Sequence, residues 1–214
     1  MRTRSLLIFA TVACAVMTAS GLAAQTHSEN DVRPHGPSGL VVGLNLTSSY
    51  ASVDGASFGD HTFTGRGREG GGGMHLTLGY NFTPAIGVLL HAGGVLLNDE
   101  DERVLGGVDL ALRYSLPGHS EAVIPYLEIA VGGYALEDET SGVGSELNGG
   151  TVSVAAGLNY FLTRRFALNA DFRYNVGTFS TARIEGQSIA DDAAMGFNTS
   201  RVNVGFNWFP MSSR

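Results

Sequence analysis

Hydrophobic and polar positions alternate with a period of two along most of the chain after residue 38. Residues 168–177, LNADFRYNVG, carry apolar side chains on one parity and mostly polar or charged side chains on the other. In a β-strand these two parities point to opposite faces of the sheet. The alternation predicts eight strands, at residues 40–46, 74–82, 86–90, 104–114, 127–131, 152–160, 168–177 and 202–208. We expect no helix beyond one turn at 188–195.

The connections between these strands alternate between short and long. The short ones are at residues 83–84, 117–121 and 163–165, and the long ones at 52–72, 98–103, 137–149 and 178–196. Long connections without structure are unusual in a compact soluble domain. Short turns at one end, long loops at the other and an even strand count are typical of transmembrane β-barrels. The pattern therefore predicts an all-β fold, an eight-stranded antiparallel up-and-down transmembrane β-barrel.

The first 24 residues are predicted to be a secretory signal peptide. Arg2 and Arg4 precede an apolar run at 6–17, and small residues follow it before Gln25. The run is too short to span a bilayer as a helix. Cys14, the single cysteine, lies within it, so we expect the mature chain to form no disulfide.

The rest of the chain divides into three predicted parts. Residues 25–38 are polar with two prolines, which indicates a flexible N-terminal tail. Residues 39–210 form the predicted barrel, and 211–214 a short C-terminal tail.

The net charge of the chain argues against nucleic-acid binding, and its low fraction of charged residues argues against a barrel whose outer face contacts water. Formal net charge is −7, and loss of the two signal-peptide arginines would make it −9. An acidic chain without basic clusters is a poor nucleic-acid binder. Soluble surfaces are about 25–35% charged, but this chain is 15% charged. The polar parity of the strands is mostly Gly, Ser, Thr, Asn and Ala, which suits a narrow lumen and leaves the apolar parity to face lipid.

Aromatic residues are predicted to form rings at the two ends of the barrel, as in membrane-interface belts. The ring near the short turns would contain Tyr80, Phe82, Tyr114, Tyr126, Tyr160, Phe161, Phe166, Trp208 and Phe209. A second ring near the long loops would contain Tyr50, Tyr174 and Phe179.

Charged residues on the polar parity are balanced in sign. They are Asp109, Arg113, Glu128, Asp171, Arg173 and Arg201. The interior of an eight-stranded barrel is just filled by side chains, and a buried charge must be paired and hydrogen-bonded. Arginine suits this role because its planar fork binds a carboxylate through two hydrogen bonds. With His75 and His91, these residues form a predicted structural polar network in the lumen.

Turn positions predict which residues lie opposite each other. A turn centred at Arg164 would place Asp171 opposite Gly157, and Arg173 opposite Ala155, so that large side chains face small ones. A turn centred at residue 83 would place His75 opposite His91. Two histidines are too few for a zinc site, which needs at least three protein ligands. We therefore expect a hydrogen-bonded pair and no metal site.

Other sequence motifs give no catalytic or cofactor site. Residues 65–70 match GxGxxG, but a dinucleotide site needs a strand before the motif and a helix after it. Here a strand follows, so a flexible loop is predicted. The acidic run at 98–103 lacks the spacing of a calcium loop, and the consecutive residues 119–121 cannot converge as a triad. We expect no cofactor and no enzymatic activity.

The chain resembles the OmpA/OmpX-like family of small outer-membrane β-barrels over roughly residues 39–210. The resemblance rests on the signal peptide, Gly/Asn-rich strands such as TVSVAAGLNYF, the TRR turn and the closing strand RVNVGFNWFP. It implies eight antiparallel strands, insertion by the outer-membrane assembly machinery and a polar interior without a wide pore. Family members usually end on an aromatic residue, whereas this chain continues past Phe209 as PMSSR.

Three functions are compatible with the sequence. The first is an exported barrel in the bacterial outer membrane, with a structural or surface-interaction role and long acidic extracellular loops. We would expect such a barrel to be a monomer in contact with outer-membrane lipid and lipopolysaccharide. The second is a secreted, soluble, lipocalin-like ligand-binding barrel, which needs the apolar parity inside. The third is a narrow ion-conducting pore.

Overall fold

A computed structural model describes residues 37–54, 56–58, 61–63, 66–97, 103–116, 122–140, 143–184, 187–190 and 195–210. The predicted signal peptide, residues 25–36 of the predicted tail and the last four residues lie outside this set, as do 98–102 and 117–121. No helix in the described part of the chain is long and apolar enough to cross a membrane.

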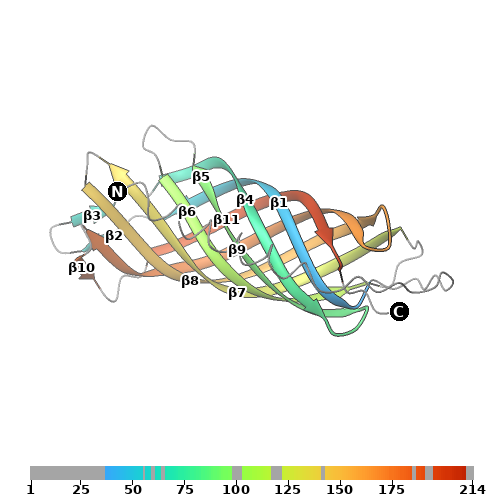
Figure 1. The fold of residues 1–214 in the computed structure, drawn as a ribbon. Helices are drawn as coiled ribbons and strands as arrows, with labels where there is room; N and C mark the ends of the chain where they lie inside the picture. Colours follow the sequence, from blue (N-terminus) through green and yellow to red (C-terminus); the bar gives the residue numbers. More distant parts are fainter. Residues whose placement is uncertain are drawn as a thin grey trace. The chain divides into compact units, whose positions relative to one another are not determined.

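Eight long antiparallel strands close into one barrel (Figure 1). Each pairs with the long strands before and after it, and the first pairs with the last. They are β1 (Gly39–Val53), β4 (Arg66–Asn81), β5 (Ile86–Leu97), β6 (Arg103–Ser115), β7 (Val123–Thr140), β8 (Val143–Phe161), β9 (Phe166–Ile184) and β11 (Met195–Trp208). The short strands are β2 (Ala56–Phe58), which pairs with β3 (His61–Phe63), and β10 (Gln187–Ala190), which pairs with β9. The predicted fold class is confirmed.

Several strands are longer than predicted, and the predicted loops are shorter. Residues 66–72 of the predicted loop 52–72 belong to β4, which also takes in most of the GxGxxG motif. Most of 137–149 belongs to β7 and β8, and 178–184 to β9. The helical turn expected at 188–195 is wrong at both ends, because 188–190 belong to β10 and Met195 begins β11. Residues 191–194 lie outside the described residues. Gly, Ser, Thr and charged residues are frequent in these strand ends, so no apolar parity marks them in the sequence.

The strand registers fix the size of the barrel. Paired positions can be followed around the barrel from Tyr50 of β1, first to β11 and then through β9, β8, β7, β6, β5 and β4. The path returns to β1 at Leu40, ten residues away. With strands about 4.8 Å apart and rising about 3.4 Å per residue, a shear of ten over eight strands gives a tilt of about 41° and a backbone radius of about 8 Å. Side chains fill a lumen of this size.

The apolar parity lies on the outside of the barrel. Leu158 is 42% exposed and Leu168 48%, and the same holds for outward residues on every long strand. The soluble lipocalin-like alternative needs these side chains inside, so it is wrong. A continuous apolar outer wall of this extent marks a surface that contacts lipid or protein, and a closed barrel satisfies all of its backbone groups within lipid.

The turns at 82–85 and 162–165 have the same hydrogen-bonded construction. The predicted strand register is correct at 162–165 and wrong at 82–85. In each turn a threonine hydroxyl accepts hydrogen bonds from the two backbone N–H groups two and three residues later, at 3.0–3.2 Å. The turn at 162–165 centres at Arg164, which confirms the pairs Asp171–Gly157 and Arg173–Ala155. The turn at 82–85 centres at residue 84 instead of 83, so His91 lies opposite Thr77 and not opposite His75.

Only part of each predicted aromatic ring is correct. Near the short turns, Tyr80, Phe82, Tyr114, Tyr160 and Phe166 are outward and 44–63% exposed. Trp208 stacks on Phe166, with ring centroids 6.1 Å apart. The prediction is wrong for four residues that point inward, because their positions have the luminal parity: Tyr126, Phe161, Phe179 and Phe209. Tyr50 and Tyr174 remain outward near the long loops.

Candidate functional site: the luminal network

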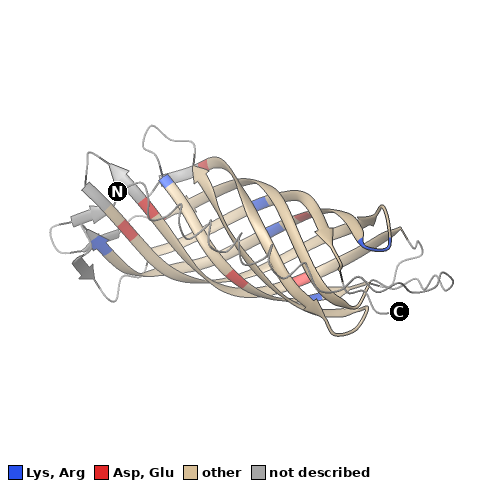
Figure 2. Ribbon diagram, viewed as in Figure 1, with Lys and Arg blue, Asp and Glu red and all other residues tan. Residues whose placement is uncertain are grey.

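The eight predicted polar residues have the luminal parity on β4, β5, β6, β7, β9 and β11, and we call them the luminal network. Figure 2 marks the charged positions along the strands. All but Asp171 are at most 9% exposed, and Asp171 is partly buried. Three carboxylates and three guanidinium groups give the network no net charge when both histidines are neutral.

Glu128 of β7 is the centre of the first cluster. Its Oε1 accepts a hydrogen bond from Arg113 Nε at 2.6 Å, and its Oε2 forms an ion pair with Arg173 Nη2. His91 Nε2 lies 3.3 Å from the same Oε2. Arg113, Glu128, Ala155 and Arg173 occupy one row of paired positions on β6, β7, β8 and β9. Because Ala155 has a small side chain, Arg173 reaches across β8 to the carboxylate.

Asp109 of β6 is the centre of the second cluster. Its Oδ2 accepts hydrogen bonds from Tyr134 Oη at 2.7 Å and from Arg201 Nη2 at 3.3 Å. The same Nη2 lies 2.6 Å from Tyr134 Oη and 3.0 Å from Asn175 Oδ1. Arg201 and Arg173 are directly opposite each other on β11 and β9. Like charges so placed repel, and each arginine turns to a different carboxylate.

A chain of hydrogen bonds joins the second cluster to Asp171. Arginine can only donate, so Arg201 Nη1 donates to His75 Nε2 at 2.7 Å. His75 Nδ1 then carries its proton toward Thr47 Oγ1 at 2.7 Å, and Thr47 donates to Asn203 Oδ1 at 2.6 Å. Asn203 Nδ2 donates to Asp171 Oδ1 at 2.7 Å.

The two histidines therefore belong to different clusters. His91 Nδ1 lies 3.0 Å from Thr77 Oγ1, and its Nε2 faces Glu128 and Arg173. His75 faces Thr47 and Arg201. The register shift at the 82–85 turn accounts for this separation. Among the described residues, no group of three or more His, Cys, Asp or Glu side chains could hold a metal ion.

Sequence reasoning missed several polar partners in the lumen. Tyr126 donates to Asp171 Oδ2 at 3.2 Å, and the guanidinium of Arg113 lies 4.0 Å above its ring. Asn169 Nδ2 donates to Tyr126 Oη at 2.7 Å. The sequence did contain a signal for these partners, because asparagine and tyrosine occur at positions with the luminal parity. On β7, for example, Tyr126 and Tyr134 share the parity of Glu128.

Inward glycines provide the space for these large side chains. A Cβ on Gly132 would lie 2.2 Å from Asp109 Oδ1, and one on Gly157 would lie 2.6 Å from both Asp171 Cβ and the Tyr126 ring. A Cβ on Gly93 would lie 2.6 Å from the His75 ring. These distances are too short for real contacts, so the glycines are required by the packing of the lumen.

Two apolar clusters flank the polar network inside the barrel. The cluster toward the long loops contains Ala51, Val95, Leu97, Leu105, Tyr134, Leu136, Leu147, Phe179, Ala182, Met195 and Phe197. The cluster toward the short turns contains Val41, Leu89, Ala111, Ala130, Ala167 and Phe209, with Phe161 packed against it. Phe179 stacks on Phe197 at a centroid distance of 4.2 Å. The cavity among the polar side chains has a volume of about 10 Å³, which is about the space that one water molecule needs.

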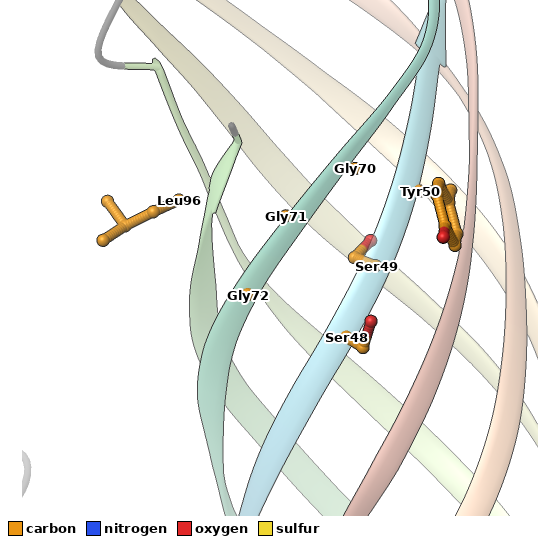
Figure 3. A pocket seen from close by; sticks show the side chains of 7 residues that line it. All are labelled: Ser48, Ser49, Tyr50, Gly70, Gly71, Gly72 and Leu96. Atoms are coloured by element: carbon orange, nitrogen blue, oxygen red, sulfur yellow. The ribbon is translucent and has the colours of Figure 1, made fainter. Parts of the chain in front are cut away.

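The outer wall has a shallow depression of about 580 Å³ near the long-loop end (Figure 3). Backbone of Gly70, Gly71 and Gly72 forms its floor, and the outward side chains of Tyr50 and Leu96 stand on either side. A Cβ on Gly70 would lie 3.3 Å from the Tyr50 ring, so this ring packs over the glycine. The depression belongs to the outer surface and not to the lumen.

Comparison with known proteins places this barrel in a family. No curated protein sequence matches the chain. Among solved structures, it is similar to Neisserial surface protein A, with a TM-score of 0.59, 16% identity and coverage of 81% of this chain and 99% of that chain. It is also similar to OprG from Pseudomonas aeruginosa, with a TM-score of 0.55, 17% identity and coverage of 83% and 98%.

Likeness at this level of identity shows the fold alone. The family evidence is a sequence match of the outer membrane protein β-barrel domain to residues 11–208, a range that includes all eight long strands. The chain therefore belongs to the outer membrane protein β-barrel domain family.

Proposed function

We propose that this outer-membrane barrel is a closed, non-conducting anchor that presents its long-loop end at the bacterial cell surface. The observation that carries the proposal is the filled lumen, in which ion-paired side chains lie between two apolar clusters. We propose no enzymatic activity and no cofactor for it.

The luminal network opposes ion flow for an electrostatic reason. An ion that enters must leave its hydration shell, because the cavity among the polar side chains has room for about one water molecule. It must also displace a guanidinium or a carboxylate from a buried partner, and breaking such a pair is strongly unfavourable. Phe179, Phe197 and Met195, each at most 4% exposed, add an apolar barrier that excludes water.

The long-loop end offers the surface for contacts outside the membrane. β7, β8 and β9 have 18 or 19 residues, whereas β5 has 12 and β6 has 13. Asp54 and Glu137 are exposed near this end, and Glu146 is partly exposed. We propose that this acidic end makes the surface contacts, and that the barrel is exported by its signal peptide, inserted by the assembly machinery and monomeric among lipid and lipopolysaccharide.

Single-channel recording in planar bilayers tests the proposal. The full mature barrel should give no conductance steps, and a known porin added afterwards should give steps in the same bilayer. The charge-neutral variant Glu128→Ala/Arg173→Ala removes one ion pair. Conductance in this variant but not in the wild type would show that the luminal network blocks ion flow. Reproducible steps from the wild-type barrel would overturn the proposal and favour the ion-conducting pore.

A further inference from the structure

The turn between β8 and β9 carries two adjacent exposed arginines, Arg164 and Arg165. It is the blue turn at the right of Figure 2. Neither arginine takes part in the luminal network, and neither forms an ion pair with a described residue. The equivalent turn between β4 and β5, residues 82–85, has the same backbone construction but no charge.

Hydrogen bonds hold this turn in one shape. Thr163 Oγ1 accepts from the N–H groups of Arg165 and Phe166, at 3.2 and 3.1 Å. Leu162 N–H donates to the Phe166 carbonyl at 2.9 Å, and Phe209 N–H donates to the Arg165 carbonyl at 2.8 Å. The backbone of the turn is thus tied both to itself and to the end of β11, so the two arginines extend from a fixed base.

The described residues at the two ends of the barrel differ in charge. Described residues at the short-turn end include no aspartate or glutamate, and their exposed charges are those of Arg164 and Arg165. Exposed acids lie at the long-loop end, for example Asp54 and Glu137. Among the described residues, the charge exposed at the short-turn end is therefore positive and lies at the 162–165 turn.

Outward apolar side chains surround the base of the turn. Tyr160, Leu162 and Phe166 are 45%, 59% and 44% exposed, and Trp208 stacks on Phe166. Aromatic rings of this kind lie at the level of lipid headgroups, and arginine side chains there extend toward the phosphate layer. The guanidinium fork matches a phosphate through two parallel hydrogen bonds.

We propose that the turn at 162–165 binds the headgroup of an anionic glycerophospholipid of the phosphatidylglycerol type, with its phosphate at Arg164 and Arg165 and its acyl chains along Leu162 and Phe166. The inference rests on the proposed membrane placement, in which short turns face the periplasm. The occupant is a phospholipid of that leaflet, because the two exposed arginines and the outward aromatic side chains meet at this turn.

The single tryptophan of the chain provides a local probe. Trp208 lies beside the turn through its stack on Phe166. The full mature barrel would be placed in phosphatidylcholine vesicles that contain a minor fraction of lipid with brominated acyl chains, either phosphatidylglycerol or phosphatidylcholine. Brominated chains quench tryptophan fluorescence on contact, so the two quenching curves give the local enrichment of the anionic lipid. We expect stronger quenching by brominated phosphatidylglycerol, and a smaller difference at high salt.

Variants assign the effect to the turn. A basic residue near an anionic membrane surface contributes about 1 kcal/mol, which is about fivefold in enrichment per arginine and about 30-fold for the pair. Arg164→Ala/Arg165→Ala should therefore lose the preference, whereas Arg164→Lys/Arg165→Lys should keep most of it. Arg183→Ala, which removes an exposed arginine near the long-loop end, should leave the preference unchanged.

Three results would overturn the proposal. The first is equal quenching of the wild-type barrel by both lipids, which needs no variant. The second is a preference that survives the double alanine substitution. The third is an equal loss in Arg183→Ala, which would indicate a general charge effect. A gel shift between boiled and unboiled samples confirms that each variant is a folded barrel. None of these readouts measures conductance, so failure of this proposal is distinguishable from failure of the proposed non-conducting function.

Discussion

Replacement of Glu128 by glutamine should destabilise the barrel strongly, although the two side chains have nearly the same shape. Glu128 is 2% exposed and accepts from Arg113 and Arg173 at once. Glu128→Gln leaves both guanidinium groups buried without a balancing charge, and the luminal network then holds two acids against three bases. Removing one partner of a buried ion pair costs about 3–5 kcal/mol, and we expect the free energy of unfolding to fall by about that amount.

Urea unfolding of the barrel in lipid vesicles measures this loss, with Trp208 fluorescence as the signal and gel migration as a second probe. Glu137→Gln removes the same charge from an exposed position near the long-loop end and should cause no measurable change. In a double-mutant cycle with Arg173→Met, the cost of the two substitutions together should be smaller than the sum of their separate costs, by at least about 1 kcal/mol. A Glu128→Gln barrel as stable as the wild type would refute the role of this ion pair.

Three further predictions, one of them with a control substitution, test the walls of the barrel by the same unfolding assay. Gly132→Val should cost about 1–3 kcal/mol because its Cβ meets Asp109, whereas Gly133→Ala lies on the exposed outer wall, where its Cβ would make an ordinary 3.8 Å contact with the Gly149 carbonyl oxygen, and should be tolerated; equal effects would contradict this packing. Tyr134→Phe removes a donor to Asp109 and should cost about 1–3 kcal/mol; a neutral result would exclude that hydrogen bond. Ile129→Arg, on the outer wall, should cost about 2–4 kcal/mol, and stability equal to the wild type would argue against lipid contact there.

Period-two alternation predicted the strands well where one face meets lipid, because apolar and polar positions then differ sharply. It failed where β7, β8 and β9 continue toward the long loops, since apolar residues no longer mark one face. Phe179 illustrates a second limit: its aromatic character suggested a belt, but its parity placed it in the lumen.

Registers could be predicted only as well as the turns that set them. The 162–165 turn was centred correctly, and the 82–85 turn was displaced by one residue, which moved His91 by two positions relative to its neighbour. Recognition of the shared threonine cap would have corrected this error. Contacts across the lumen, such as His75 with Arg201, depend on the shear of the whole barrel, and no single hairpin contains that information.

Pairing of β1 with β11 closes the barrel, so each of the eight long strands has a partner on both sides until this pair is lost. These strands are the first and last of the eight, and twelve paired positions join them, from Val42–Trp208 to Val53–Phe197. A sheet in which β11 has not yet paired with β1 has two unpaired edges, and lipid offers no hydrogen-bond partner to either edge. The sheet is therefore stable in lipid only once this last pairing has formed, and before that its two open edges can pair with other chains and aggregate.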